Sequence, residues 1–436
     1  MSELVFLWYL LLTAATMWIG VRAYGTWINH ITMYGLVWGI QLSLFELRLI
    51  QYPDLSVETL FFIFGAWAIF VLAALTFRNF YGQKLTVGYR AESTNFKVLT
   101  AVLVALTLIG AIGTLQHWMI LLRMFGSVKS VVINANLLYA FRRSEAGFPG
   151  MWPYIDAVSL AADFLGGYYA GLRRKPMVLG ILPFVVELIN AIAAFGRSRL
   201  LIGAILWGTA FFLPHLRTQK SSWESKKKTI IMVLAVLGLF VFGMEFVRMF
   251  RGVNEKFHGE TSSLSNMKGL GFVTPSIYLY LSSDVAVLNK FLEYEFDGRI
   301  EHTPVGGNTF APFYRIFAKL GLSQTVLEYQ KTYAVPVSTN TASYLRELYA
   351  DWGIGGALFV VYLLGASCSI AVEAYRRRRS LVLLALVGHL FVIVFFTFIV
   401  QATREGYWFV SFFFSMIGAA IVDRSSRRVD LGPNGR

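Results

Sequence analysis

The sequence predicts an all-α membrane protein whose chain crosses the bilayer many times. Of its 436 residues, 56% are hydrophobic, 16% are aromatic and only 15% are charged, proportions far from those of a soluble domain. The apolar residues collect in about eleven runs of roughly 17 to 25 residues, the length that a helix needs to cross ~30 Å of hydrocarbon. A polytopic bundle of about eleven transmembrane helices is therefore expected.

The predicted spans are distributed unevenly, with most of them before a long polar connection and the rest after it. The first span has no basic flank before it and no small-residue cleavage site after it, which indicates a retained helix rather than a signal peptide. No internal repeat is visible, whereas secondary transporters are usually built from two related halves. In chain order, the spans are expected near residues 3–20, 31–50, 57–77, 98–122, 155–172, 176–194, 200–214, 229–247, 348–372, 381–400 and 406–422.

The chain accordingly divides into four parts. Residues 1–248 hold the first eight spans, 249–345 form a large loop, 346–422 hold the last three spans, and 423–436 form a basic tail. Two loop stretches, TPSIYLYLSSDVAVLNKFLEYEF and NTFAPFYRIFAKLGL, have helical apolar spacing and are expected to pack back on the bundle. The only cysteine, Cys368, lies inside a span, so no disulfide framework holds the loop.

The positions of Lys and Arg predict the orientation, because short cytoplasmic loops retain positive charge. Basic residues collect at 173–175, 217–228, 376–379 and in the tail, all on one side of the predicted membrane. That side is expected to be cytoplasmic, with the C-terminus on it and the long loop on the opposite face. The loop is then the one large region available for chemistry outside the bilayer.

The net charge of +14 has two sources. The cytoplasmic basic residues follow from the orientation rule and from attraction to anionic membrane lipids. The arginines at predicted outer helix ends suit a lipid-linked phosphate or diphosphate, because a guanidinium offers a planar fork to phosphate oxygens. The alternative for each is an arginine that extends to lipid headgroups. The predicted location excludes nucleic acid as a partner.

Four stretches resemble a known family. They are NHITMYGLVWGIQLSLFELRLIQYPDLSVETLFFIFGAW at 29–67, FGRSRLLIGAILWG at 195–208, TPVGGNTFAPFYRIFAKLG at 303–321, and NTASYLRELYADWGIGGALFVVYLLG at 340–365. With their order along the chain, they resemble Wzy-type oligosaccharide repeat-unit polymerases, which include the O-antigen polymerases. Members also carry an Arg followed eleven positions later by Gly, as Arg197 with Gly208 and Arg248 with Gly259 do here.

The resemblance implies a GT-C-type glycosyltransferase in a bacterial inner membrane, with its active site facing the periplasm. Such an enzyme transfers a growing glycan from undecaprenyl diphosphate to a hydroxyl of a new lipid-linked repeat unit, with inversion and without a metal. A copolymerase that sets chain length is an expected partner. The residues themselves indicate no cofactor, since no phosphate-binding glycine loop, HExxH or CxxC occurs. The acidic cluster in EYEFDG is interpreted as solvated surface rather than a metal site.

Several residues are expected to bind the lipid diphosphate or the sugar. The arginines lie at predicted outer membrane boundaries, and the tight turn at 196–199 restricts where its two arginines can point. The alternative for that pair is a structural clamp on helix carbonyls. The substrate-binding set is Arg197, Arg199, Arg248, Arg251, Arg346, Asn340 and Tyr344.

A general base for the acceptor hydroxyl is expected among four residues: His302, Asp284, Asp351 and Glu347. His302 would act as a neutral imidazole beside the diphosphate, although a lone loop histidine is more often ordinary surface. Asp351 also fits a cap on the ninth span, and Glu347 fits an ordinary solvated side chain or one that positions the acceptor sugar.

Two alternative functions remain open. A flippase for lipid-linked sugars would use carboxylates within apolar segments, such as Glu46, Glu187 and Glu245, for proton coupling. A buried Glu187 held by a Tyr or Arg of another helix is the structural alternative to that role. An O-antigen ligase would share the architecture and the donor, and would differ in the acceptor.

Overall fold

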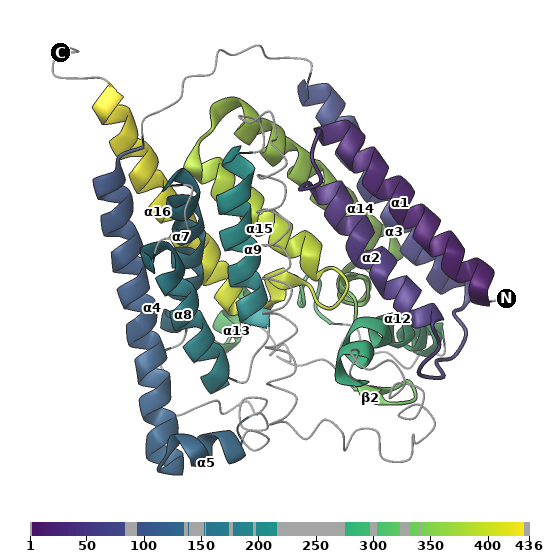
Figure 1. The fold of residues 1–436 in the computed structure, drawn as a ribbon. Coiled ribbons are helices and arrows are strands. Elements are labelled where there is room, and N and C mark those ends of the chain that lie inside the picture. The colour runs from purple at the N-terminus through teal and green to yellow at the C-terminus, as the bar shows by residue number, and fades with distance from the viewer. Residues whose placement is uncertain are drawn as a thin grey trace. The chain divides into compact units, whose positions relative to one another are not determined.

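The computed structural model describes residues 2–82, 94–134, 138, 152, 154–173, 178–194, 198–215, 275–296, 303–322, 332–339 and 342–430. Regular structure in these residues is almost entirely helical (Figure 1). The described strands are β1 (Tyr333–Ala334) and β2 (Ser338–Thr339), which pair antiparallel with Tyr333 opposite Thr339. The expectation of a helical membrane protein agrees with this architecture.

The chain forms two compact units that interleave along the sequence. Unit 1 comprises residues 1–83, 252–370 and 393–406, and unit 2 comprises 84–251, 371–392 and 407–436. Helices α14 (Tyr344–Arg378) and α15 (Leu381–Phe396) contribute residues to both units. Each unit therefore draws on sequence from both sides of the predicted long loop.

Unit 1 is built on a close pair of helices, α1 (Ser2–Tyr24) and α2 (His30–Glu46). A Cβ added to Gly35 would lie 2.7 Å from Thr16 Cγ2, and one added to Gly39 would collide with Thr13. Small residues four apart thus let the two backbones approach, as they do in many membrane helix pairs. Unit 1 also contains β1, β2, parts of α14 and α15, and the helices α3 (Val57–Gly82), α12 (Pro275–Phe296), α13 (Ala311–Lys319) and η4 (Ala402–Arg404).

Loop helix α12 packs on α2, as the sequence predicts for this stretch of the loop. The Tyr278 hydroxyl donates to the Leu44 carbonyl, and Gln41 donates to Asp284 at 3.2 Å. Ser282 pairs with the Tyr52 hydroxyl at 2.8 Å. These polar contacts hold α12 against the end of α2.

Helix α14 is interrupted at Gly353, whose φ of 64° and ψ of −177° are not helical. Only glycine adopts this conformation without steric cost. The interruption separates a polar beginning, which carries Arg346, Glu347 and Asp351, from the long apolar remainder of the helix. The polar residues of the NTASYLRELYADWGIGG stretch are thereby presented on a short helical segment of their own.

Unit 2 is centred on α7 (Val158–Arg173), which packs against α4 (Phe96–Phe125), α8 (Val178–Ala194) and α9 (Ser198–Phe212) (Figure 1). Glycines make these crossings possible: a Cβ on Gly110 of α4 would lie 2.7 Å from the Ser159 nitrogen. The remaining described elements of this unit are α5 (Val128–Ile133), η1 (Ile155–Ala157), η2 (Leu213–His215) and α16 (Gly406–Asp430).

Five helices in the described residues are long and apolar enough to cross a membrane: Leu4–Tyr24, Val57–Phe80, Phe96–Phe125, Tyr344–Arg378 and Gly406–Ser426. Three shorter apolar helices cover 178–193, 198–212 and 381–396. Ten of the predicted spans fall on helices, and the span at 229–247 lies outside the described residues. The protein is thus a helical membrane protein, and the number of its spans stays a prediction.

Candidate functional site

The first turns of α14 place four of the predicted site residues in unit 1: Tyr344, Arg346, Glu347 and Asp351. The Tyr344 nitrogen donates to the Thr397 carbonyl at 3.0 Å, which ties the start of the helix to the segment that follows α15. Tyr344, Arg346, Glu347 and Asp351 are all buried. A set of polar side chains in the interior requires partners, and these partners define the site.

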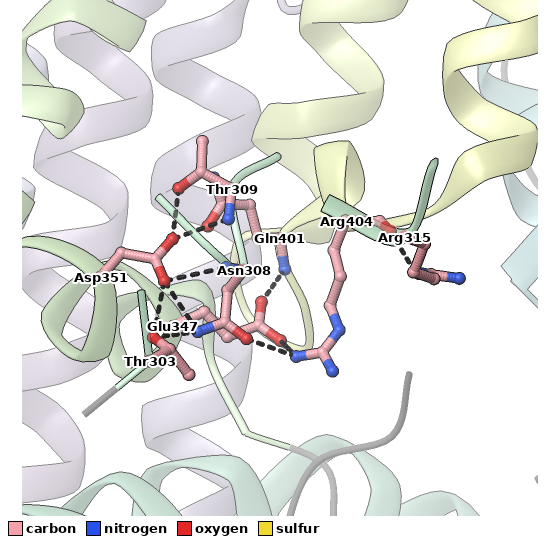
Figure 2. Close-up of polar contacts among 8 residues, drawn as sticks. All are labelled: Thr303, Asn308, Thr309, Arg315, Glu347, Asp351, Gln401 and Arg404. Carbon is pink, nitrogen blue, oxygen red and sulfur yellow. Dashed lines mark hydrogen bonds and ion pairs between the residues drawn. The ribbon is translucent and has the colours of Figure 1, made fainter. Parts of the chain in front are cut away.

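The Asp351 carboxylate accepts hydrogen bonds from the turn at 303–309 (Figure 2). Its Oδ1 accepts from the Thr303 hydroxyl at 3.0 Å and from the Asn308 main-chain and side-chain nitrogens at 2.8 and 2.9 Å. Its Oδ2 accepts from the Thr309 nitrogen and hydroxyl, both at 2.7 Å. A carboxylate has about four lone-pair sites, so these bonds use its full capacity. The geometry therefore supports an anchor for the turn rather than a base or a cap on α14.

Glu347 forms a buried ion pair with Arg404, a residue that was not among the predicted site residues. Glu347 Oε1 lies 3.0 Å from Arg404 Nη1, and Glu347 Oε2 accepts from the Gln401 nitrogen at 2.6 Å. The same Arg404 nitrogen donates to Asn308 Oδ1 at 2.8 Å, while Arg315 donates to the Arg404 carbonyl at 3.0 Å (Figure 2). This network joins α14, the 303–309 turn, η4 and α13, so Glu347 is not the solvated side chain that one interpretation offered.

Arg346 lies beside this network. Its side chain is 3% exposed, and Nη1 and Nη2 have no hydrogen-bond partner among the described residues. The guanidinium lies over the Tyr333 ring at 5.9 Å, within the range of a cation–π contact. Burial raises the pKa of the Tyr333 hydroxyl and the positive charge of Arg346 opposes that rise, so the ring faces the cation as a neutral phenol. A buried guanidinium with open donors is suited to an anion that enters from outside.

Asp284 and Tyr344 are the other predicted site residues described in unit 1. Asp284 is fully buried on α12, accepts from Gln41 and lies in electrostatic range of Arg346. The Tyr344 hydroxyl pairs with that of Tyr34 at 2.9 Å, and its ring lies near Trp38. Tyr344, which was expected to bind substrate, thus packs in the interior of unit 1.

Arg199 belongs to a different cluster, in unit 2. Its Nε donates to Glu187 Oε1 at 2.7 Å, its Nη2 donates to Glu187 Oε2 at 3.3 Å, and its Nη1 donates to Asp156. Arg199 was expected to bind a diphosphate. Two carboxylates accept hydrogen bonds from its guanidinium instead, so these donors are not open to a ligand. The structural alternative for Glu187, a carboxylate held by an arginine of another helix, is confirmed.

The other predicted site residues lie outside the described residues. They are His302, Arg197, Arg248, Arg251 and Asn340. Among the residues that are described, no group of three or more His, Cys, Asp or Glu side chains is arranged to hold a metal ion. No protein-family model, no curated protein and no solved structure matches the chain. The site must therefore be interpreted from its own chemistry.

Proposed function

We propose that this protein is a glycosyltransferase that polymerises oligosaccharide repeat units carried on undecaprenyl diphosphate. The observation that carries the proposal is Arg346, a buried cation whose two terminal nitrogens have no hydrogen-bond partner in the part of the chain that the structure describes. It stands at the start of a membrane-length helix, where the diphosphate of a lipid carrier would lie. The type of reaction is inferred from the resemblance to Wzy-type polymerases, and Arg346 is the proposed binding site for the diphosphate leaving group.

In the proposed reaction, the acceptor hydroxyl attacks the anomeric carbon of the growing glycan with inversion. The new glycosidic bond forms as the bond from that carbon to the diphosphate oxygen breaks, and undecaprenyl diphosphate leaves. Negative charge develops on the departing diphosphate, and a preorganised cation in a dry site stabilises it. Arg346 has this role, while the Glu347–Arg404 pair keeps the neighbouring turn of α14 in place.

The proton of the acceptor hydroxyl must pass to a base. Asp351 is saturated and Glu347 is paired, which leaves Asp284 as the carboxylate best placed near Arg346 among the described residues. Asp284 is therefore the proposed base. His302 keeps its predicted role as the other candidate, and it directly precedes the turn that Asp351 anchors.

The location is part of the proposal. The site faces the periplasm from a bacterial inner membrane, the C-terminus is cytoplasmic, and a GT-C-type helical bundle surrounds the lipid carrier. The prevalence of Lys and Arg on the opposite face supports this orientation. A copolymerase that sets chain length is the expected protein partner.

The test is reconstitution of the purified protein in nanodiscs with a lipid-linked repeat unit and a chelator, followed by electrophoresis of the products. The wild-type protein should give a ladder. Arg346→Ala should slow it by about 10²–10³-fold, the loss typical of one charge-stabilising donor. Arg346→Lys, which keeps the charge without the planar fork, should fall between the two. Arg376→Ala is the matched control, since Arg376 lies on the same helix in a partly exposed pair with Glu373.

A ladder formed at the wild-type rate by Arg346→Ala would contradict the proposed diphosphate site. The two alternatives produce different results in the same system. A ligase would transfer the glycan to a lipid A core acceptor and give no ladder with repeat units alone. A flippase would move lipid-linked sugar across a proteoliposome membrane without forming any new glycosidic bond.

A further inference from the structure

Unit 2 contains a buried ionic cluster where α4, η1, α7, α8 and α9 meet. Arg199 of α9 binds Asp156 of η1 and Glu187 of α8, and Ser159 of α7 donates to Glu187 at 2.5 Å. Asn190 donates to Asp156 at 2.8 Å and pairs with His117 Nδ1 of α4 at 3.3 Å. The cluster therefore forms a connected hydrogen-bonded chain in the interior of a helical bundle.

Asp163 stands next to this chain without joining it. It follows Asp156 and Ser159 at helical spacing, so it lies on the same face of α7 about one turn further along. A Cβ added to Gly203, one turn beyond Arg199 on α9, would be 2.5 Å from Asp163 Oδ2. The carboxyl group of Asp163 thus points toward α9, close to the cluster.

The Asp163 side chain is fully buried, and neither of its oxygens has a hydrogen-bond partner among the described residues. The charged groups in electrostatic range are Glu187, which repels a second carboxylate, and Arg199, whose donors already serve Glu187 and Asp156. Three carboxyl groups share one guanidinium. An ionised and unsolvated carboxylate is far more costly to bury than a neutral acid.

We propose that Asp163 is a proton-binding site, and that its carboxyl group carries a proton at neutral pH while Arg199 remains paired with Glu187 and Asp156. A metal cation is a poorer occupant, because the described residues offer no group of three side chains that would coordinate one there. A proton needs no ligand shell, and it removes the excess negative charge where that charge arises.

The arrangement links the proton to the ion pairs one turn away. If Arg199 left Glu187 or Asp156 and turned toward Asp163, the guanidinium would favour the ionised form of Asp163 and release its proton. The vacated carboxylate would then be the better proton acceptor. The other titratable groups that adjoin the cluster are His117 of α4 and Tyr407 of α16, whose ring lies 5.6 Å from the Arg199 guanidinium. Unit 2 therefore has the parts of a proton-responsive element, a property independent of the glycosyl-transfer proposal.

The first experiment compares thermal unfolding of the wild-type protein, Asp163→Asn and Asp156→Asn in the same detergent at neutral pH. Asparagine replaces a neutral acid by a neutral amide of the same shape, so Asp163→Asn should unfold at close to the wild-type temperature. Asp156→Asn is the matched control, since it removes a carboxylate that Arg199 requires and should unfold several degrees lower. If Asp163→Asn fails to fold, or is destabilised as much as the control, Asp163 is ionised and the proposal is wrong.

Infrared difference spectroscopy supplies a second measurement on the same proteins. A protonated carboxylic acid has a carbonyl stretching band that a carboxylate lacks. The wild-type spectrum at neutral pH should contain such a band, and Asp163→Asn should lose part of its intensity. A wild-type spectrum without that band, or a folded Asp163→Asn protein with the band unchanged, would overturn the assignment. Neither measurement depends on a substrate, so failure here leaves the polymerase proposal untouched.

Discussion

The buried ion pair between Glu347 and Arg404 allows the geometry around Arg346 to be tested by stability. The paired atoms are 3.0 Å apart, and the side chains are only 1% and 3% exposed. Opposite charges about 4 Å apart attract by ~4 kcal/mol at an effective dielectric constant of about 20. Removal of one partner from such a buried pair costs roughly 3–5 kcal/mol, because the remaining charge stays in the interior.

The two single substitutions should differ because Arg346 lies beside the pair. In Arg404→Gln, the Glu347 carboxylate keeps the attraction of Arg346, so the loss should lie near 3 kcal/mol, the lower end of the range for broken buried pairs. In Glu347→Gln, two buried guanidiniums remain and repel each other, so the loss should reach about 5 kcal/mol. The double variant should cost less than the sum of the single changes.

The measurement is the unfolding temperature of each purified variant, followed by circular dichroism in one detergent. Arg376→Gln is the control, because its pair with Glu373 has side chains that are 22% and 11% exposed and should contribute less than about 1 kcal/mol. Equal losses for the two single variants, the opposite order, or strict additivity in the double variant would refute this account of the ion pair with Arg346 beside it.

Two further substitutions test the elements that hold the site. Asp351→Asn should release the 303–309 turn at a cost of about 2 kcal/mol, because an amide nitrogen would face donors, and limited proteolysis should cleave that turn faster. The control is Asp423→Asn on α16, which removes a carboxylate that accepts from Ser380 and Leu381 at the start of α15 and should leave cleavage of the turn unchanged. Unchanged cleavage in Asp351→Asn would contradict the anchoring role. Gly353→Ala should cost about 1–3 kcal/mol, since φ 64° and ψ −177° are accessible essentially to glycine alone. Gly355→Ala, whose Cβ would meet nothing within 4 Å, is its control, and equal unfolding temperatures for the two would show that α14 does not require the interruption.

The helices could be predicted from sequence because hydropathy reports directly on the environment that each segment must occupy. Helices α12 and α13 follow the apolar spacing of the predicted loop helices. The residues at which helices end were less predictable. The span expected at 31–50 ends as α2 at Glu46, because Arg48 adopts a φ of 52° and bonds to the Tyr52 carbonyl and Asp54. The interruption of α14 at Gly353 was not predicted, because glycine is common in apolar membrane helices and its presence alone does not predict a break.

The site shows a limit of a different kind. Arg199 and Arg346 had the same predicted role, because both are arginines at expected membrane boundaries. The structure separates them by their neighbours: Arg199 meets two carboxylates that lie 12 and 43 residues earlier in the chain, whereas the terminal nitrogens of Arg346 have no partner in the described residues. Likewise Glu347 pairs with Arg404, which lies 57 residues later in the chain. Sequence indicates which residues carry charge, but whether folding brings a carboxylate within hydrogen-bond distance of an arginine decides whether its donors are taken or open to a ligand. By that criterion Arg346 is the residue on which a diphosphate site depends.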